Sequence, residues 1–241
     1  NLGSRICTLP GIFPEGGAKN VARRDGMGTV MLAGTLAMGT LPDWYLQAVG
    51  SGTGGIAAYE ASLRLIADGR FGTRMPRLLL FQNEPFIPMV RAWQEKRREI
   101  KDEDMSDAEQ AISQVYSDVL TNRIPPYGIV GGVFDTLIAT NGLMAGVSSA
   151  DAQEAGKLFS SSEGIDPDPA AAVCVAGLMR AVRSGVIKPD EKILLNITGG
   201  GYARGRKDLP RFVKEPDIMV SKETPFEKIS AAVQEWMRYY A

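Results

Sequence analysis

Histidine is absent from the 241 residues of the sequence, and cysteine occurs only twice. Without histidine the chain lacks the usual general base of hydrolytic triads and the most frequent ligand of transition metals. Cys7 and Cys174 stand in apolar surroundings without C-x-x-C spacing, so we expect buried free thiols, as in a reducing cytoplasm. These scarcities argue against a metal site and against a histidine-based hydrolase.

Charge of one sign and long apolar runs are missing as well. The formal net charge is −1, and the short basic cluster Lys96 to Arg98 lies among acidic neighbours, which leaves no footprint for nucleic acid or for an acidic membrane surface. No apolar run approaches the length of a transmembrane helix, and the first residues, NLGSRICTLPG, are not typical of a signal peptide. We therefore expect a cytoplasmic protein that binds small molecules and neither nucleic acid nor membrane.

The sequence contains an alternation of short apolar runs and helical patterns, typical of an α/β protein with a mostly parallel sheet flanked by helices. We expect one domain over residues 1–241, with residues 101–128 as a surface excursion that ends in a proline pair. The predicted strands are 44–49, 77–82, 143–147 and 192–197. The predicted helices are 24–38, 54–67, 87–98, 130–141, 149–161, 169–184 and 225–239.

One predicted strand runs directly into a glycine-rich turn and a helix, in the stretch YLQAVGSGTGGIAAYEA from Tyr45 to Ala61. Glycines leave the backbone N–H groups accessible, and a helix start adds free donors and the positive end of its dipole, so the turn is suited to an anion such as phosphate. Gly50, Gly52 and Gly55 also fit G-x-G-x-x-G, the pattern of a dinucleotide fold, with Glu84 as the acidic partner. A third interpretation is a tight turn that binds nothing.

Three further segments accompany this turn: PEGGAKNVARRDGMGTVML (14–32), EGIDPDPAAAVCVAGL (163–178) and LLNITGGGYARG (194–205). In this order the four segments resemble the large domain of fold type II pyridoxal-phosphate enzymes, the tryptophan synthase β-like group that includes threonine synthase. Within the group the resemblance is to an archaeal branch of coenzyme M biosynthesis, which replaces the phosphate of O-phosphoserine by sulfite.

The resemblance implies a role for each of these segments. Pyridoxal phosphate would be bound through its phosphate by the turn formed by Gly52, Thr53, Gly54, Gly55 and Ile56. Thr198 would hydrogen-bond the pyridine nitrogen, and a neutral hydroxyl at that position favours elimination of a β-substituent over transamination. Capping a helix or a turn is the alternative role for this threonine.

Lys19, Asn20 and Arg23 correspond to the segment that binds the phosphate of the substrate in threonine synthases, with Lys19 as an addition. Cationic side chains stabilise the charge that grows on a departing phosphate. For the neighbouring Arg24, a surface ion pair with Asp25 is the simpler expectation. Gln82 and Asn83, at the end of a strand, are weaker candidates for substrate contact.

The lysine that forms the Schiff base in fold type II enzymes has no counterpart among the lysines of this sequence, so no catalytic residue is assigned. We expect the chain to be a partial enzyme whose activity alone is doubtful, and to form a dimer, as family members commonly do. Three rival interpretations remain: threonine synthase acting on phosphohomoserine, a dinucleotide-binding domain, and a binding module without catalysis.

Overall fold

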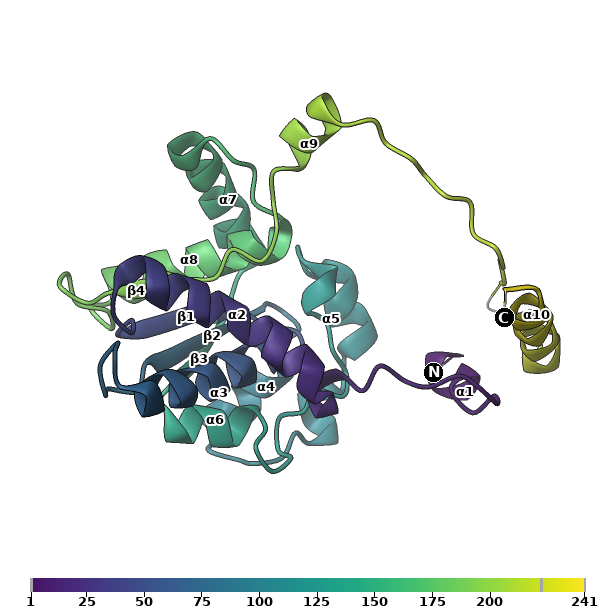
Figure 1. Cartoon of the computed structure of the whole chain (residues 1–241), viewed down its shortest axis with the longest axis horizontal. Coiled ribbons are helices and arrows are strands. Elements are labelled where there is room, and N and C mark those ends of the chain that lie inside the picture. Colours follow the sequence, from purple (N-terminus) through teal and green to yellow (C-terminus); the bar gives the residue numbers. More distant parts are fainter. Residues whose placement is uncertain (1, 222, 241) are drawn as a thin grey trace. The chain divides into compact units, whose positions relative to one another are not determined.

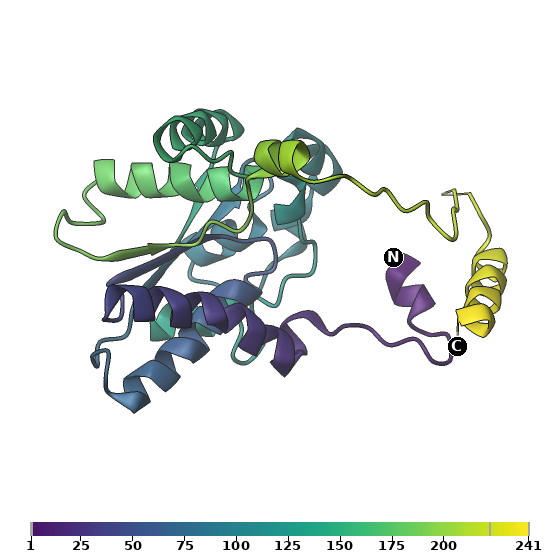
Figure 2. The same cartoon turned by 45° about the horizontal axis from the view of Figure 1, so that its top comes forward.

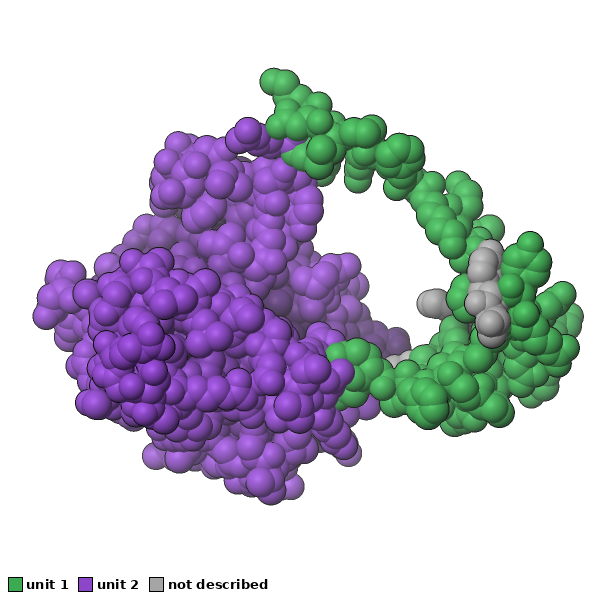
Figure 3. Space-filling model, in the orientation of Figure 1, with its two compact units in different colours: residues 1–16, 205–241 green, residues 17–204 purple. Residues whose placement is uncertain are grey.

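A computed structural model describes residues 2–221 and 223–240. The chain divides into two compact units, one formed by residues 17–204 and the other by residues 1–16 and 205–241 (Figure 3). All four segments singled out above lie wholly or mainly in the larger unit. Each unit is described by itself.

The larger unit contains a sheet of four strands, counted over the described residues: β1 (Trp44–Ala48), β2 (Arg77–Asn83), β3 (Leu143–Val147) and β4 (Ile193–Leu195). All pairings are parallel, in the order β3-β2-β1-β4. Leu46 of β1 pairs with Leu79 of β2 on one side and with Leu195 of β4 on the other. The α/β fold class with a parallel sheet is thereby confirmed, as are the four predicted strands.

Helices cover both faces of this sheet because successive strand side chains alternate between two apolar layers. Tyr45, Leu78 and Leu80 belong to one core cluster, and Trp44 and Phe81 to the other. The helices α2 (Val21–Met38), α3 (Thr53–Asp68), α4 (Pro88–Gln94) and α6 (Val133–Ala139) lie on the first side; α7 (Ser149–Glu163) and α8 (Pro169–Arg183) lie on the second (Figures 1 and 2). Parallel strands covered in this way collect their following loops at one edge of the sheet.

Two predicted helices are shorter than the apolar pattern indicated. The one expected over 87–98 ends at Gln94, and Lys96 adopts a positive φ of 56°. The one expected over 130–141 begins at Val133, after Gly131 with φ 70° and the N-cap Gly132. Periodicity does not register a left-handed residue, so it extended both helices too far.

The segment 101–128 contains two 3₁₀ turns, η2 (Asp102–Met105) and η3 (Asp118–Leu120), and the helix α5 (Ala108–Gln114). Several of its side chains are buried, including Asp104 at 4% exposed and Tyr127 at 1%. The carboxylate of Asp104 accepts from both Nη atoms of Arg97, at 3.0 and 2.9 Å, and from the backbone N–H of Lys101 at 2.8 Å. This bidentate pair ties the start of the segment to the end of α4.

Replacing Asp104 by asparagine should therefore destabilise the protein by about 2 kcal/mol near neutral pH, because Arg97 would lose the buried one of its two charged acceptors and keep only the exposed Glu95. Burial raises the pKa of Asp104, but the hydrogen bonds from Arg97 and Lys101 outweigh it and hold the pKa below its usual value. Because the folded-state pKa is lowered, the ionised carboxylate stabilises the fold at pH values above the unfolded-state pKa of about 3.9. This stabilisation is lost as the pH falls through the folded-state pKa. In urea unfolding, the difference in free energy of unfolding between Asp104→Asn and the unsubstituted protein should thus be smaller at pH 3 than at pH 7. The exposed Asp102→Asn is the control, and a loss of stability from it equal to that of Asp104→Asn would contradict this prediction.

In the smaller unit, α1 (Leu2–Ile6) and α10 (Phe226–Tyr240) are in contact. The guanidinium of Arg5 lies 4.1 Å from the ring centre of Phe226, and Ile229 is 6% exposed. The short helix α9 (Tyr202–Asp208) spans the boundary between the units. The apolar pattern predicted α10 but neither α1 nor α9, since short helices carry little periodic signal.

Cys174 is buried in α8, and its pKa is raised by that burial, in agreement with the sequence expectation. Cys7 is only partly buried, so the expectation of burial was wrong for this residue. Both thiols are free.

Candidate functional site

The glycine turn joins β1 to α3 at the edge where the strands end. Gly52 is the N-cap of α3 and adopts a left-handed φ of 80°. The N–H of Ile56 donates to the Gly52 carbonyl at 3.1 Å, as the first bond of the helix. The N–H groups of Gly54 and Gly55 have no acceptor within the described residues. Two adjacent donors at the positive end of a sixteen-residue helix form a suitable cradle for an anion.

Close packing also explains why these residues are glycines. A Cβ on Gly52 would overlap the Val133 side chain of α6, and one on Gly54 would overlap the amide of Gln47. A Cβ on Gly50 would lie 2.9 Å from the carbonyl oxygen of Val119. The turn is thus held between β1, α6 and η3, so its donors are fixed in place.

Ser51, which sequence analysis did not single out, takes part in the same turn. Its hydroxyl lies 2.9 Å from that of Thr53 and accepts from the Thr53 N–H at 3.3 Å. The Thr53 side chain is buried in the turn. A serine just before a helix start is a common capping residue, and that signal could have identified it.

Thr198 follows β4, the strand that pairs with β1, so the two candidate loops leave neighbouring strands at the same edge of the sheet. Its side chain is exposed and makes no hydrogen bond in the part of the chain that the structure describes. It does not cap α9, which begins four residues later at Tyr202. The capping role considered for Thr198 therefore has no support in the structure, and its hydroxyl is available to a ligand.

The three glycines after Thr198 pack against the loop before α8. Gly199 accepts from the N–H of Asp168 at 3.0 Å, and Gly201 donates to the carbonyl of Asp166 at 2.7 Å. A side chain at Gly199 or Gly200 would overlap this loop. These contacts fix the segment that carries Thr198. The free hydroxyl of Thr198 and the free N–H groups of the glycine turn are donors of the kind that bind a phosphate and a ring nitrogen.

The segment with Lys19, Asn20 and Arg23 forms the start of α2. Asn20 is the N-cap, and its side chain accepts from the Arg23 N–H at 3.2 Å. Lys19 and Arg23 are exposed. The expected pairing of Arg24 with Asp25 was wrong: Arg24 binds Glu60 of α3 at 2.9 Å, and Asp25 binds Arg64. The Arg24–Glu60 pair holds this segment against α3, about two helical turns from the glycine turn.

Gln82 and Asn83 are buried at 0% and 1% exposed. Gln82 Oε1 accepts from the Val90 N–H at 3.1 Å, while Asn83 donates to the Val147 carbonyl and accepts from the Ser117 N–H. Asn83 therefore binds backbone through both amide atoms, which gives it a structural role. Gln82 binds backbone through Oε1 alone, and its buried Nε2 has no hydrogen-bond partner among the described residues.

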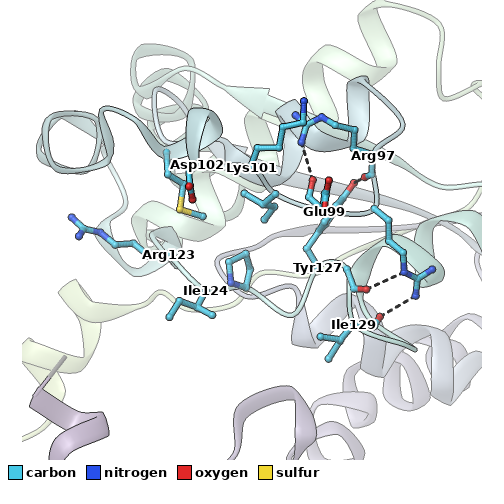
Figure 4. Close-up of a pocket in the computed structure, with 13 residues that line it drawn as sticks. Arg97, Glu99, Lys101, Asp102, Arg123, Ile124, Tyr127 and Ile129 are labelled. Carbon is cyan, nitrogen blue, oxygen red and sulfur yellow. Dashed lines mark hydrogen bonds between the residues drawn. The ribbon is translucent and has the colours of Figure 1, made fainter.

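A cavity of about 960 Å³ lies elsewhere, between residues 97–105 and 123–129. Figure 4 shows Arg97, Lys101 and Arg123 at its wall together with Ile124, Tyr127 and Ile129. Its cations are already paired, Arg97 with Asp104 and Arg98 with Asp135. None of the nine candidate residues lines it.

Among the described residues no cluster of side chains could hold a metal ion, and no helix combines the length and apolarity needed to cross a membrane. The family of pyridoxal-phosphate dependent enzymes matches residues 4–199. The chain therefore belongs to this family, whose cofactor is pyridoxal phosphate.

The chain is similar to cysteate synthases. It is 98% identical to that of Methanospirillum hungatei JF-1 over 241 residues, all of this chain and 57% of the relative. It is 59% identical to that of Methanoculleus marisnigri over 98% of this chain and 55% of the relative. The chain thus spans a little over half the length of the curated relatives it matches. A serine racemase structure from Dictyostelium discoideum, 15% identical with a TM-score of 0.49, covers 73% of this chain and 49% of its own.

Proposed function

We propose that the whole protein is a pyridoxal-phosphate enzyme that converts O-phosphoserine and sulfite to cysteate and phosphate. The observation that carries this proposal is the 98% identity to a cysteate synthase along the entire chain. At this level of identity a different substrate would require its determinants to lie in the part of the protein that this chain does not span.

The candidate residues divide the work of binding between two groups. The N–H groups of Gly54 and Gly55, with Gly52, Thr53 and Ile56 shaping the turn, bind the phosphate of the cofactor. The hydroxyl of Thr198 would donate one hydrogen bond to the pyridine nitrogen, which stays unprotonated and uncharged. When bound, pyridoxal phosphate supplies a ring that withdraws electrons from the α-carbon.

The second group binds the substrate. Arg23 and Lys19 lie exposed at the start of α2 and stabilise the phosphate as it departs, while Asn20 fixes the backbone of that turn. The Schiff-base lysine and the groups that bind the substrate carboxylate belong to the remaining part of the protein. The localisation is cytoplasmic, and the assembly is a dimer.

The test compares two reactions of the full-length protein purified with its cofactor. We expect release of phosphate from O-phosphoserine that depends on sulfite, with cysteate detected by mass spectrometry. Turnover of phosphohomoserine to threonine instead would support threonine synthase. Absence of both activities, in a protein that binds the cofactor, would support a binding module.

A dinucleotide-binding domain is disfavoured by the family match and by the position of Glu84. The carboxylate of Glu84 lies against Gly146 of β3, so close that a Cβ on that glycine would overlap it. It therefore faces away from the glycine turn, which follows β1. Calorimetric titration with NAD would give no binding heat if this assignment is right.

A further inference from the structure

Gln47 lies on β1 beneath the glycine turn. Its side chain is 6% exposed, and its amide lies directly against the backbone of Gly54, where any side chain on Gly54 would overlap both terminal atoms of the amide. Gln47 therefore forms part of the surface on which the first turn of α3 rests. A glutamine is a costly residue for such a buried position unless its amide is used.

A chain of hydrogen bonds fixes that amide. Asn196 Nδ2 donates to the hydroxyl of Tyr45 at 2.8 Å, and this hydroxyl donates to Gln47 Oε1, also at 2.8 Å. Tyr45 is fully buried. Its burial, partly offset by the hydrogen bond from Asn196, raises the pKa of its phenol far above the usual value, so the donating proton is retained at all physiological pH values.

This arrangement joins the two loops that carry the candidate cofactor residues. Gln47 and Tyr45 belong to β1, which leads into the glycine turn, whereas Asn196 follows β4 and precedes Thr198 by two residues. Because Oε1 is held by Tyr45, the amide nitrogen is the side that remains for the turn, and it makes no hydrogen bond within the described residues.

We propose that Gln47 is a positioning residue for the phosphate-binding turn, oriented by Tyr45 and Asn196 so that the turn and the Thr198 segment keep a fixed spacing. The proposal rests on the proposed function for the identity of the anion. Gln47 acts through the backbone of Gly54, and it touches no reacting atom. Loosening its amide should weaken phosphate binding more than it weakens the fold.

The experiment uses the full-length protein with Gln47→Leu, Tyr45→Phe and the double variant. Ser62→Ala is the matched control, since the buried Ser62 hydroxyl donates to the Ala58 carbonyl in α3 without contacting the turn. Calorimetry measures the affinity for pyridoxal phosphate, with pyridoxal as the ligand that lacks the phosphate. Amide hydrogen exchange of residues 53–56 measures the order of the turn without a ligand.

We expect Gln47→Leu and Tyr45→Phe each to weaken pyridoxal phosphate binding by about tenfold, a loss of the order of one hydrogen bond, with little change for pyridoxal. The double variant should be no weaker than Gln47→Leu, because both changes break one chain. Ser62→Ala should lower the melting temperature without changing the affinity. Amide exchange at residues 53–56 should accelerate in Gln47→Leu but not in the control Ser62→Ala.

The two possible failures are distinguishable. If the unsubstituted chain binds pyridoxal phosphate and pyridoxal equally poorly, the assignment of the turn to the cofactor phosphate fails, while the exchange data still test the positioning role. If Gln47→Leu leaves both the affinity and the exchange unchanged, or changes them no more than Ser62→Ala does, Gln47 is a packing residue and the inference is overturned.

Discussion

Replacing Gly52 by alanine is expected to weaken pyridoxal phosphate binding by about 10- to 100-fold, because the turn that presents the Gly54 and Gly55 N–H groups could not keep its shape. Two physical effects combine at this residue. Its φ of 80° is unfavourable for any side chain, and the added Cβ would overlap Val133. Together they should also destabilise the fold by about 3 kcal/mol.

Calorimetric titration and urea unfolding check this result. The control is Gly39→Ala at the C-cap of α2, where φ is 69° and nothing lies within 4 Å of an added Cβ. That variant should lose only about 1 kcal/mol and no affinity. Adding Val133→Ala to Gly52→Ala should restore part of the stability. Unchanged affinity in Gly52→Ala would show that the turn does not bind the phosphate.

Replacing Arg23 by alanine in the full-length protein is expected to lower kcat/KM for O-phosphoserine by roughly 100-fold, the usual loss when one donor to a developing oxyanion is removed. The residue lies exposed in the first turn of α2, so the free energy of unfolding should change by less than about 0.5 kcal/mol. Cofactor affinity should not change, which separates this effect from that of Gly52→Ala.

Steady-state phosphate release at varied O-phosphoserine concentration provides the measurement. Arg70→Ala is the matched control: this exposed arginine pairs with Asp68 at the end of α3 and lies outside the candidate segment. It should leave kcat/KM within twofold. Arg23→Lys should recover part of the loss, because a lysine keeps the charge but not the paired donors. A loss below threefold in Arg23→Ala would assign the leaving phosphate to other residues.

Local patterns in the sequence predicted the parallel sheet well. Leu143–Val147 was predicted with its observed bounds, and the bounds of β1 and β2 each differ by one residue at the end of the strand. Short apolar runs between helical patterns identify such strands because both faces of the sheet are buried. Helix ends were less accurate, since a single left-handed residue such as Lys96 stops a helix without changing its apolar pattern.

The partners of polar side chains were beyond the reach of sequence patterns. Arg24 has an acidic neighbour at Asp25, yet its partner is Glu60, thirty-six residues away. Asn83 has a side chain that often binds ligands and lies at a strand end, but it binds the backbone of two other segments. Such pairings depend on how distant elements pack, and spacing along the chain does not encode that.

The sequence by itself determined the class of the protein. It determined the succession of strands and helices along the chain, the glycine turn after Val49 and the family to which these segments belong, because backbone conformation and apolar periodicity are local properties. Only the tertiary structure decided that Gly54 rests on Gln47, that Tyr45 and Asn196 orient this amide, and that Thr198 leaves the strand next to the turn. These relations depend on the order of the strands within the sheet. There β4 lies beside β1 although almost 150 residues separate them, as the hydrogen bond from the Lys192 N–H to the Asp43 carboxylate shows.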